Sequence, residues 1–163
     1  MTVALREVDE NHDWQVFAGW LDQPHVLASW GQPADIIAEL QQHPRGDMRV
    51  ITLNNGPIGL ACWQVPTAKE LMVAGLSDLP KSLVDIDIML GEVSFLGLGH
   101  GTRALGLLAK YLKQQGVGWI GLAAKKSNQA AIRSFAKVGC IPFRDFTEDD
   151  KLYTYFVLDL QKV

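Results

Sequence analysis

The chain has 163 residues, of which 48% are hydrophobic and 20% are charged. This length predicts one compact domain with a single core, and the composition excludes disordered and fibrous proteins. The net charge of −3 is unevenly distributed, because residues 100–144 contain eight Lys or Arg and no Asp or Glu. The acid-free segment suits a phosphate ligand, and the acid-rich part before it suits a cation.

The sequence also argues against several other classes of protein. Residues 1–10 lack the basic start and apolar run of a signal peptide, and no stretch has the length of a membrane span. Cys62 and Cys140 lie in strand-like segments without metal-ligand spacing, which predicts buried free thiols. Basic and aromatic residues do not interleave as in nucleic-acid binders. We therefore expect a cytoplasmic protein without a metal ion, nucleic-acid partner or membrane contact.

The first half of the chain predicts a helical region followed by a hairpin. Apolar periodicity indicates these elements: a strand over 3–6, helices over 14–21 and 33–40, and strands over 48–53 and 57–64. Asn54-Asn55-Gly56 joins the last two strands, and Asn-Gly favours a hairpin because both residues tolerate positive φ. Residues 66–82 predict a loop with room for a turn of helix or a strand end.

The second half alternates strands and helices. Residues 83–90 predict a strand with Asp85 and Asp87 on one side. The following elements are expected after it: a glycine loop over 97–101, a helix over 102–115, a strand over 119–124, a helix to about 138, and strands over 140–143 and 152–160. This order implies a mixed sheet with helices against it, in a single domain over 1–163.

The glycine loop is the clearest candidate binding site. Gly97, Gly99 and Gly101 lie where the positive end of a helix can bind a phosphate through backbone N–H groups. A mononucleotide P-loop needs a lysine before Thr102, and a dinucleotide site needs a small residue there and an acid about twenty residues later. Neither requirement is met. Coenzyme A is the third ligand class with this geometry, and a turn that only packs strand on helix is the alternative.

Two segments resemble motifs of the GNAT acetyltransferase superfamily. Leu96-Gly97-Leu98-Gly99-His100-Gly101 resembles Gln/Arg-x-x-Gly-x-Gly/Ala except at Leu96, and residues 127–140 resemble Asn-x-x-Ala-x-x-x-Tyr-x-x-x-Gly-Phe. Asn128 matches the asparagine, which can also simply cap a helix. The resemblance implies that acetyl-CoA is bound by Ile88, Met89, Gly97, Leu98, Gly99, His100, Gly101, Thr102 and Asn128.

One departure from the second motif concerns proton transfer. Phe135 occupies a position where the family often has a tyrosine that protonates the departing thiolate of coenzyme A. That role is therefore vacant or reassigned. Tyr153, Tyr155 or solvent could fill it, and the thiolate is a good enough leaving group that an acid is not obligatory.

Acyl transfer to an amine needs a group that accepts the proton of the amine. Asp85 and Asp87 are the catalytic candidates, because two like charges on one strand face raise the pKa of one of them. Structural ion pairing or binding of an ammonium is the alternative role, above all for Asp85. Residues 86–90 resemble the strand that carries the catalytic aspartate in the aminoglycoside 6'-N-acetyltransferase branch, which favours Asp87 as the base.

The resemblance to that branch, and to its relatives that acylate hydroxylysine in siderophore synthesis, extends to residues 20–26 and 56–59. It implies an α+β fold with a mixed, mostly antiparallel central sheet flanked by helices on both faces, in a monomer or homodimer. We expect acetylation of a small cationic amine, with an aminoglycoside as the leading acceptor and Trp30, Asp85 and Glu92 as its contacts. Hydroxylysine, a polyamine, a peptide N-terminus, or CoA binding without catalysis are the alternatives.

Overall fold

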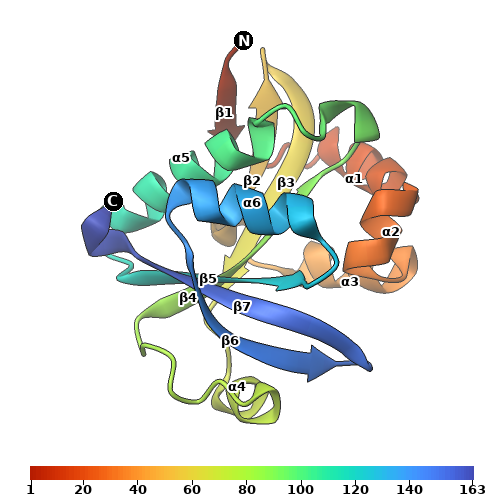
Figure 1. The fold of residues 1–163 in the computed structure, drawn as a ribbon. Helices are drawn as coiled ribbons and strands as arrows, with labels where there is room; N and C mark the ends of the chain where they lie inside the picture. The colour runs from red at the N-terminus through yellow and green to blue at the C-terminus, as the bar shows by residue number, and fades with distance from the viewer. The chain divides into compact units, whose positions relative to one another are not determined.

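The computed structural model describes all residues from Met1 to Val163 (Figure 1). Six α-helices are present: α1 (Asp13–Leu21), α2 (Pro24–Trp30), α3 (Pro33–Gln42), α4 (Ala68–Ala74), α5 (His100–Gln114) and α6 (Gln129–Val138). Three short 3₁₀ helices accompany them: η1 (Arg45–Asp47), η2 (Val93–Phe95) and η3 (Leu160–Lys162). None of the helices is long and apolar enough to cross a membrane.

Seven strands form one sheet. Their bounds are β1 (Val3–Arg6), β2 (Met48–Leu53), β3 (Gly56–Gln64), β4 (Leu83–Leu90), β5 (Trp119–Lys125), β6 (Ile141–Glu148) and β7 (Lys151–Asp159). The strand order is β1-β2-β3-β4-β5-β7-β6. β4 and β5 run parallel, whereas β1 with β2, β2 with β3, β5 with β7 and β6 with β7 are antiparallel. The expected mixed, mostly antiparallel sheet is confirmed.

The chain divides into two compact units, and the division falls within β3, β4 and α5. The first unit contains Met1–Cys62 and Ile88–Ala104, and the second contains Trp63–Asp87 and Leu105–Val163. Each unit has its own apolar cluster. Both cysteines are buried and free, as the sequence predicts.

The structure corrects several predicted elements. Pro24–Trp30 forms a helix that the sequence analysis did not predict, with Pro24 in its first turn and Gly31 at its end at a φ of 102°. The expected loop over 66–82 contains α4, which begins with a capping box between Thr67 and Glu70. β6 extends to Glu148, beyond the predicted end at 143, and α5 begins at His100 rather than at Thr102.

In the first unit, α1, α2 and α3 lie side by side (Figure 1). Their apolar residues pack against residues of β2 and β3 in a buried cluster that includes Phe17, Leu21, Val26, Leu40, Met48, Val50 and Leu60. Gly91 allows a close approach there, because a Cβ at this position would lie 2.0 Å from the ring of Trp20. The end of β4 therefore packs directly on α1.

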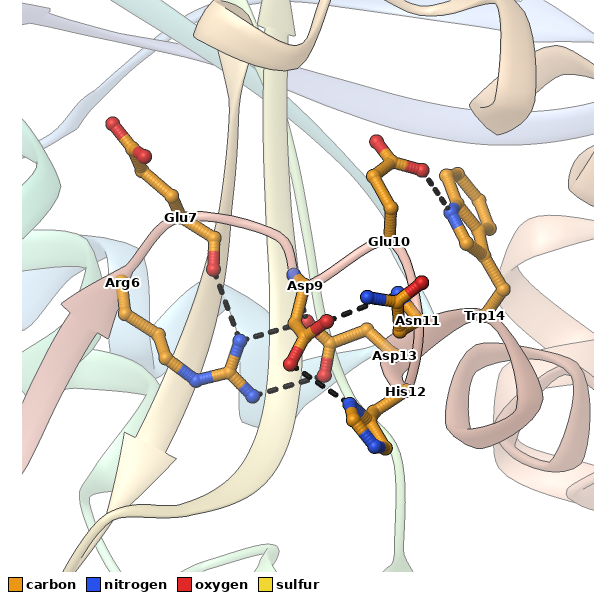
Figure 2. Close-up of polar contacts among 8 residues, drawn as sticks. All are labelled: Arg6, Glu7, Asp9, Glu10, Asn11, His12, Asp13 and Trp14. Atoms are coloured by element: carbon orange, nitrogen blue, oxygen red, sulfur yellow. Dashed lines mark hydrogen bonds and ion pairs between the residues drawn. The ribbon is translucent and has the colours of Figure 1, made fainter.

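The start of α1 depends on a buried carboxylate (Figure 2). Asp13 is only 2% exposed, and its carboxylate accepts hydrogen bonds from both terminal nitrogens of Arg6 at 2.7 and 2.9 Å. The backbone N–H of Asp9 donates a third at 2.6 Å. Burial opposes ionisation of Asp13, but the Arg6 and Asp9 hydrogen bonds outweigh it and hold the pKa of this carboxyl below its ordinary value.

We expect Asp13→Asn to lower the free energy of unfolding at pH 7 by about 2–4 kcal/mol, because it leaves the guanidinium of Arg6 without its charged partner. The pKa of Asp13 is lower in the folded state, so its stabilisation is present above the unfolded pKa and is lost as the pH falls through the folded pKa. Urea denaturation at pH 7 and below pH 3 should therefore show a smaller difference at the lower pH. Asp22→Asn, which changes an exposed carboxylate at the end of α1, is the control. Equal stability of Asp13→Asn and wild type at pH 7 would contradict this assignment.

Candidate active site

The two predicted carboxylates lie together in the second unit, where Gln64 at the end of β3 bridges them. The Nε2 group of Gln64 donates to Oδ2 of Asp85 at 2.8 Å and to Oδ2 of Asp87 at 3.3 Å. One amide reaches both carboxylates because residues two positions apart on a strand share a face. Asp85 is half-buried and Asp87 is exposed.

A tyrosine from β7 holds the other oxygen of Asp85. The hydroxyl of Tyr155 donates to Oδ1 of Asp85 at 2.7 Å, and Tyr155 is itself 5% exposed. Its ring crosses β5 at Gly121, the residue that pairs with Asp85 in the β4–β5 register. A Cβ on Gly121 would lie 2.1 Å from the hydroxyl oxygen of Tyr155. Only glycine at position 121 leaves room for this hydrogen bond.

The surroundings of Asp85 favour its protonated form. Burial raises the pKa of Asp85 to about 7, and the negative charges of Asp87 and Glu70 act in the same direction. The hydrogen bonds from Tyr155 and Gln64 act in the opposite direction, because they stabilise the ionised form. A carboxyl group with a pKa near 7 can exchange a proton at neutral pH.

The phenol of Tyr155 remains a hydrogen-bond donor. Burial raises its pKa far above the ordinary value, and the charge of Asp85 and the hydrogen bond to it add to this effect. Phe135 is buried with its ring 5.6 Å from that of Phe156, so this position has only a packing role within the second unit. Tyr153 stacks on Phe146 at 5.2 Å.

The glycine loop lies in the first unit. Gly97 and Gly99 have φ values of 74° and 86°, in the left-handed region, and no atom lies within 4 Å of a Cβ built on either. α5 begins directly after them, and its first-turn N–H groups have no carbonyl partners within the helix. Leu98 is exposed, whereas the side chain of His100 is buried beside Phe95. The backbone of this loop is therefore open to a ligand.

The other predicted contact residues have mixed surroundings. Within the first unit, Met89 is buried, Ile88 and Trp30 are partly buried against apolar clusters, and Glu92 is exposed. In the second unit, Asn128 caps α6, because its Oδ1 accepts a hydrogen bond from the N–H of Ala131 at 3.1 Å. The capping role considered for Asn128 is confirmed.

Sequence reasoning missed the residues that support Asp85. Gln64 was read only as a strand end, and Gly121 only as part of an apolar strand. A glycine inside a strand can mark a close approach of another group, and this was the available signal for Gly121. No group of three or more His, Cys, Asp and Glu side chains is placed to hold a metal ion.

The model of the acetyltransferase (GNAT) domain family matches residues 9–147 of the chain. The protein therefore belongs to the GNAT acetyltransferase family. It is an acetyl-CoA-dependent N-acetyltransferase, with acetyl-CoA as co-substrate and a small molecule as acceptor.

Solved structures of aminoglycoside acetyltransferases are similar to it over nearly the whole chain. AAC(6')-Ib in complex with coenzyme A is 28% identical with a TM-score of 0.79, covering 98% of this chain and 96% of that one. AAC(6')-Ib with ribostamycin and coenzyme A is 27% identical with a TM-score of 0.80, covering 99% and 95%. An aminoglycoside N(6')-acetyltransferase from Legionella pneumophila, at 14% identity and a TM-score of 0.71 over 98% and 93%, shares the fold. No curated protein matches the chain.

The raised pKa of Asp85 predicts a specific pH dependence of stability. Because the pKa rises from 3.8 to about 7 on folding, the folded state binds more protons between these values, and the wild type loses stability as the pH rises through this window. Asp85→Asn removes this titration. Relative to wild type, the variant should gain on the order of 3 kcal/mol between pH 4.5 and pH 8, measured by urea denaturation.

The matched control is Asp150→Asn, which changes an exposed carboxylate in the same unit at a left-handed position that asparagine tolerates. Its stability difference from wild type should not change with pH. A constant difference for Asp85→Asn over the same range would show that Asp85 does not titrate near neutrality.

Proposed function

We propose that the protein transfers the acetyl group of acetyl-CoA to a primary amine of a small cationic molecule, with an aminoglycoside as the leading acceptor. The observation that carries this proposal is the bridged Asp85–Asp87 pair, which combines negative charge for a cation with a carboxyl that titrates near pH 7. The similarity to AAC(6')-Ib bound to ribostamycin supports the choice of acceptor. We treat residues 1–163 as one catalytic domain that works in the cytoplasm.

In the proposed reaction, Asp87 is the general base. An acceptor amine is largely protonated at neutral pH, so it must lose a proton before its nitrogen can attack. The exposed carboxylate of Asp87 takes this proton, while Asp85, Trp30 and Glu92 contact the acceptor. Acetyl-CoA supplies an activated acetyl group. The new C–N bond then forms as the C–S bond breaks, and solvent protonates the thiolate.

The proposed cofactor contacts use the backbone more than side chains. The left-handed glycines and the open space beside them suit a pyrophosphate at the start of α5. Since the side chains of Ile88 and Met89 pack into apolar clusters, we assign a role to their main-chain groups. The full proposed set is Ile88, Met89, Gly97, Leu98, Gly99, His100, Gly101, Thr102 and Asn128.

The acceptor is a narrower question than the reaction. Drug-modifying relatives have a further acid where this chain has Ala123 and Ala124, so fewer carboxylates are available to bind a polycation. Hydroxylysine, a polyamine or a peptide N-terminus remain the alternative acceptors. Ribostamycin, kanamycin and these three alternatives form the test panel.

The pyrophosphate site predicts that Gly99→Val weakens binding of coenzyme A by more than about 100-fold, because the new side chain fills the space that the ligand needs. Gly116→Val is a closely matched control. Gly116 ends α5 at a φ of 85° with no atom within 4 Å of an added Cβ, as at Gly99. Both variants should lose about 1–3 kcal/mol of stability from backbone strain. Calorimetric titration with coenzyme A distinguishes them, and equal affinity in both would exclude the loop as the site.

The base assignment predicts that Asp87→Asn lowers kcat by about 10²–10⁴-fold while affinity for coenzyme A stays within about twofold of wild type. Release of thiol from acetyl-CoA, measured with each amine of the panel, gives the rate, and Asp150→Asn serves as the control. An unchanged rate in Asp87→Asn would remove this residue from the mechanism. Tight binding of coenzyme A without turnover on any amine would instead favour the binding-module alternative.

A further inference from the structure

Asp85 receives hydrogen bonds from two different strands. In the strand order, β3 lies on one side of β4, and β7 lies beyond β5 on the other side. Gln64 at the end of β3 donates to one carboxylate oxygen, and Tyr155 of β7 donates to the other at 2.7 Å. Both oxygens of a half-buried carboxylate are thus held, which fixes the orientation of the group.

The contact with Tyr155 needs a specific opening in the sheet. The phenol reaches over β5, and the absence of a side chain at Gly121 provides the space for its hydroxyl. The ring itself packs in an apolar cluster with Leu79, Leu83 and Val157. A phenylalanine would fill that cluster equally well, so the hydroxyl has a polar function that packing does not explain.

Gln64 connects this hydrogen-bonded group to the proposed base. Its amide donates to Asp85 and, at 3.3 Å, to Asp87. Two carboxylates this close repel each other when both are ionised, and a shared donor reduces this repulsion. The two acids therefore titrate as a pair whose behaviour depends on Gln64 and Tyr155.

We propose that Tyr155 and Gln64 are positioning residues for the Asp85–Asp87 pair, holding Asp85 so that the pair accepts the acceptor-amine proton near neutral pH. This inference rests on the proposed role of Asp87 as the base. Gly121 belongs to the same arrangement because it admits the hydroxyl of Tyr155. The proton passes from the amine nitrogen to the carboxylate pair and then to solvent, and neither Tyr155 nor Gln64 gains or loses one.

The charges around Asp85 give the sign of the expected effect. Asp87 on the same strand and Glu70 on α4 raise the pKa of Asp85, as burial does. Tyr155 from β7 and Gln64 from β3 lower it, and β5 contributes only Gly121 at this point. Removal of either donor therefore moves the titration of Asp85 to higher pH.

The test is a carbon NMR titration of the side-chain carboxyls, which needs no acceptor. Tyr155→Phe removes only the hydroxyl and should raise the titration midpoint of Asp85 by about one pH unit. Thr154→Val is the matched control, because the hydroxyl of Thr154 on the same strand donates to another carboxylate, that of Asp145, at 2.8 Å. It should leave the Asp85 midpoint unchanged. An unchanged midpoint in Tyr155→Phe would overturn the proposal.

Two further variants guard against a misleading result. Gly121→Ala should raise the midpoint as Tyr155→Phe does, because its methyl group displaces the hydroxyl. Gln64→Met keeps the approximate length of the side chain but removes the amide, and it should shift the titrations of both carboxyls. A shift in Gln64→Met that is confined to Asp85 would contradict the bridging role.

The pH profile of kcat/KM with ribostamycin and acetyl-CoA links the titration to the reaction. Its rising limb should move upward by about one pH unit in Tyr155→Phe, with no change in the KM for acetyl-CoA and no change in Thr154→Val. A rising limb that stays in place despite a shifted Asp85 midpoint would overturn the role in proton uptake. If wild type does not acetylate ribostamycin, the aminoglycoside proposal fails, and the NMR titration still decides the positioning role.

Discussion

A carboxylate placed partly inside a β-sheet needs hydrogen-bond donors, because burial without them costs several kcal/mol. The second unit meets this need at Asp85 with donors from two other strands. This requirement explains three residues at once. Gln64 supplies an amide, Tyr155 supplies a hydroxyl, and Gly121 leaves the space between them free of a side chain. Packing alone would select none of these three residue types.

Asp85 and Asp87 differ in environment although they share a strand and a face. Asp85 is half-buried and held at both oxygens, and its pKa rises to about 7, whereas Asp87 is exposed. Such a difference allows two identical side chains to take different roles. In the proposed reaction, the exposed carboxylate meets the amine, and the protonation state of the buried one controls the local charge. The preference for Asp87 as the base thus gains a physical reason beyond the family resemblance.

Local patterns predicted much of this protein, and long-range contacts set the limit. Alternation over 83–90 placed Asp85 and Asp87 on one face, and the glycine spacing located the loop before α5. The bridge through Gln64 spans 21 residues and the contact with Tyr155 spans 70, and no local pattern encodes strand order or register. The missed helices are different, since Pro24 and the Thr67–Glu70 capping box were local signals already present in the sequence.

The departure at Phe135 also acquires a meaning from the packing of the second unit. Its ring lies against Phe156 in the buried interior, so that position provides no proton donor. The phenol of Tyr155 does not replace it, because its hydroxyl is directed to Asp85 and its raised pKa makes it a weak acid. A thiolate leaves readily without protonation, whereas an ammonium cannot attack until its proton has been removed. The side chains of this unit that handle protons are therefore placed where the amine, rather than the leaving group, requires them.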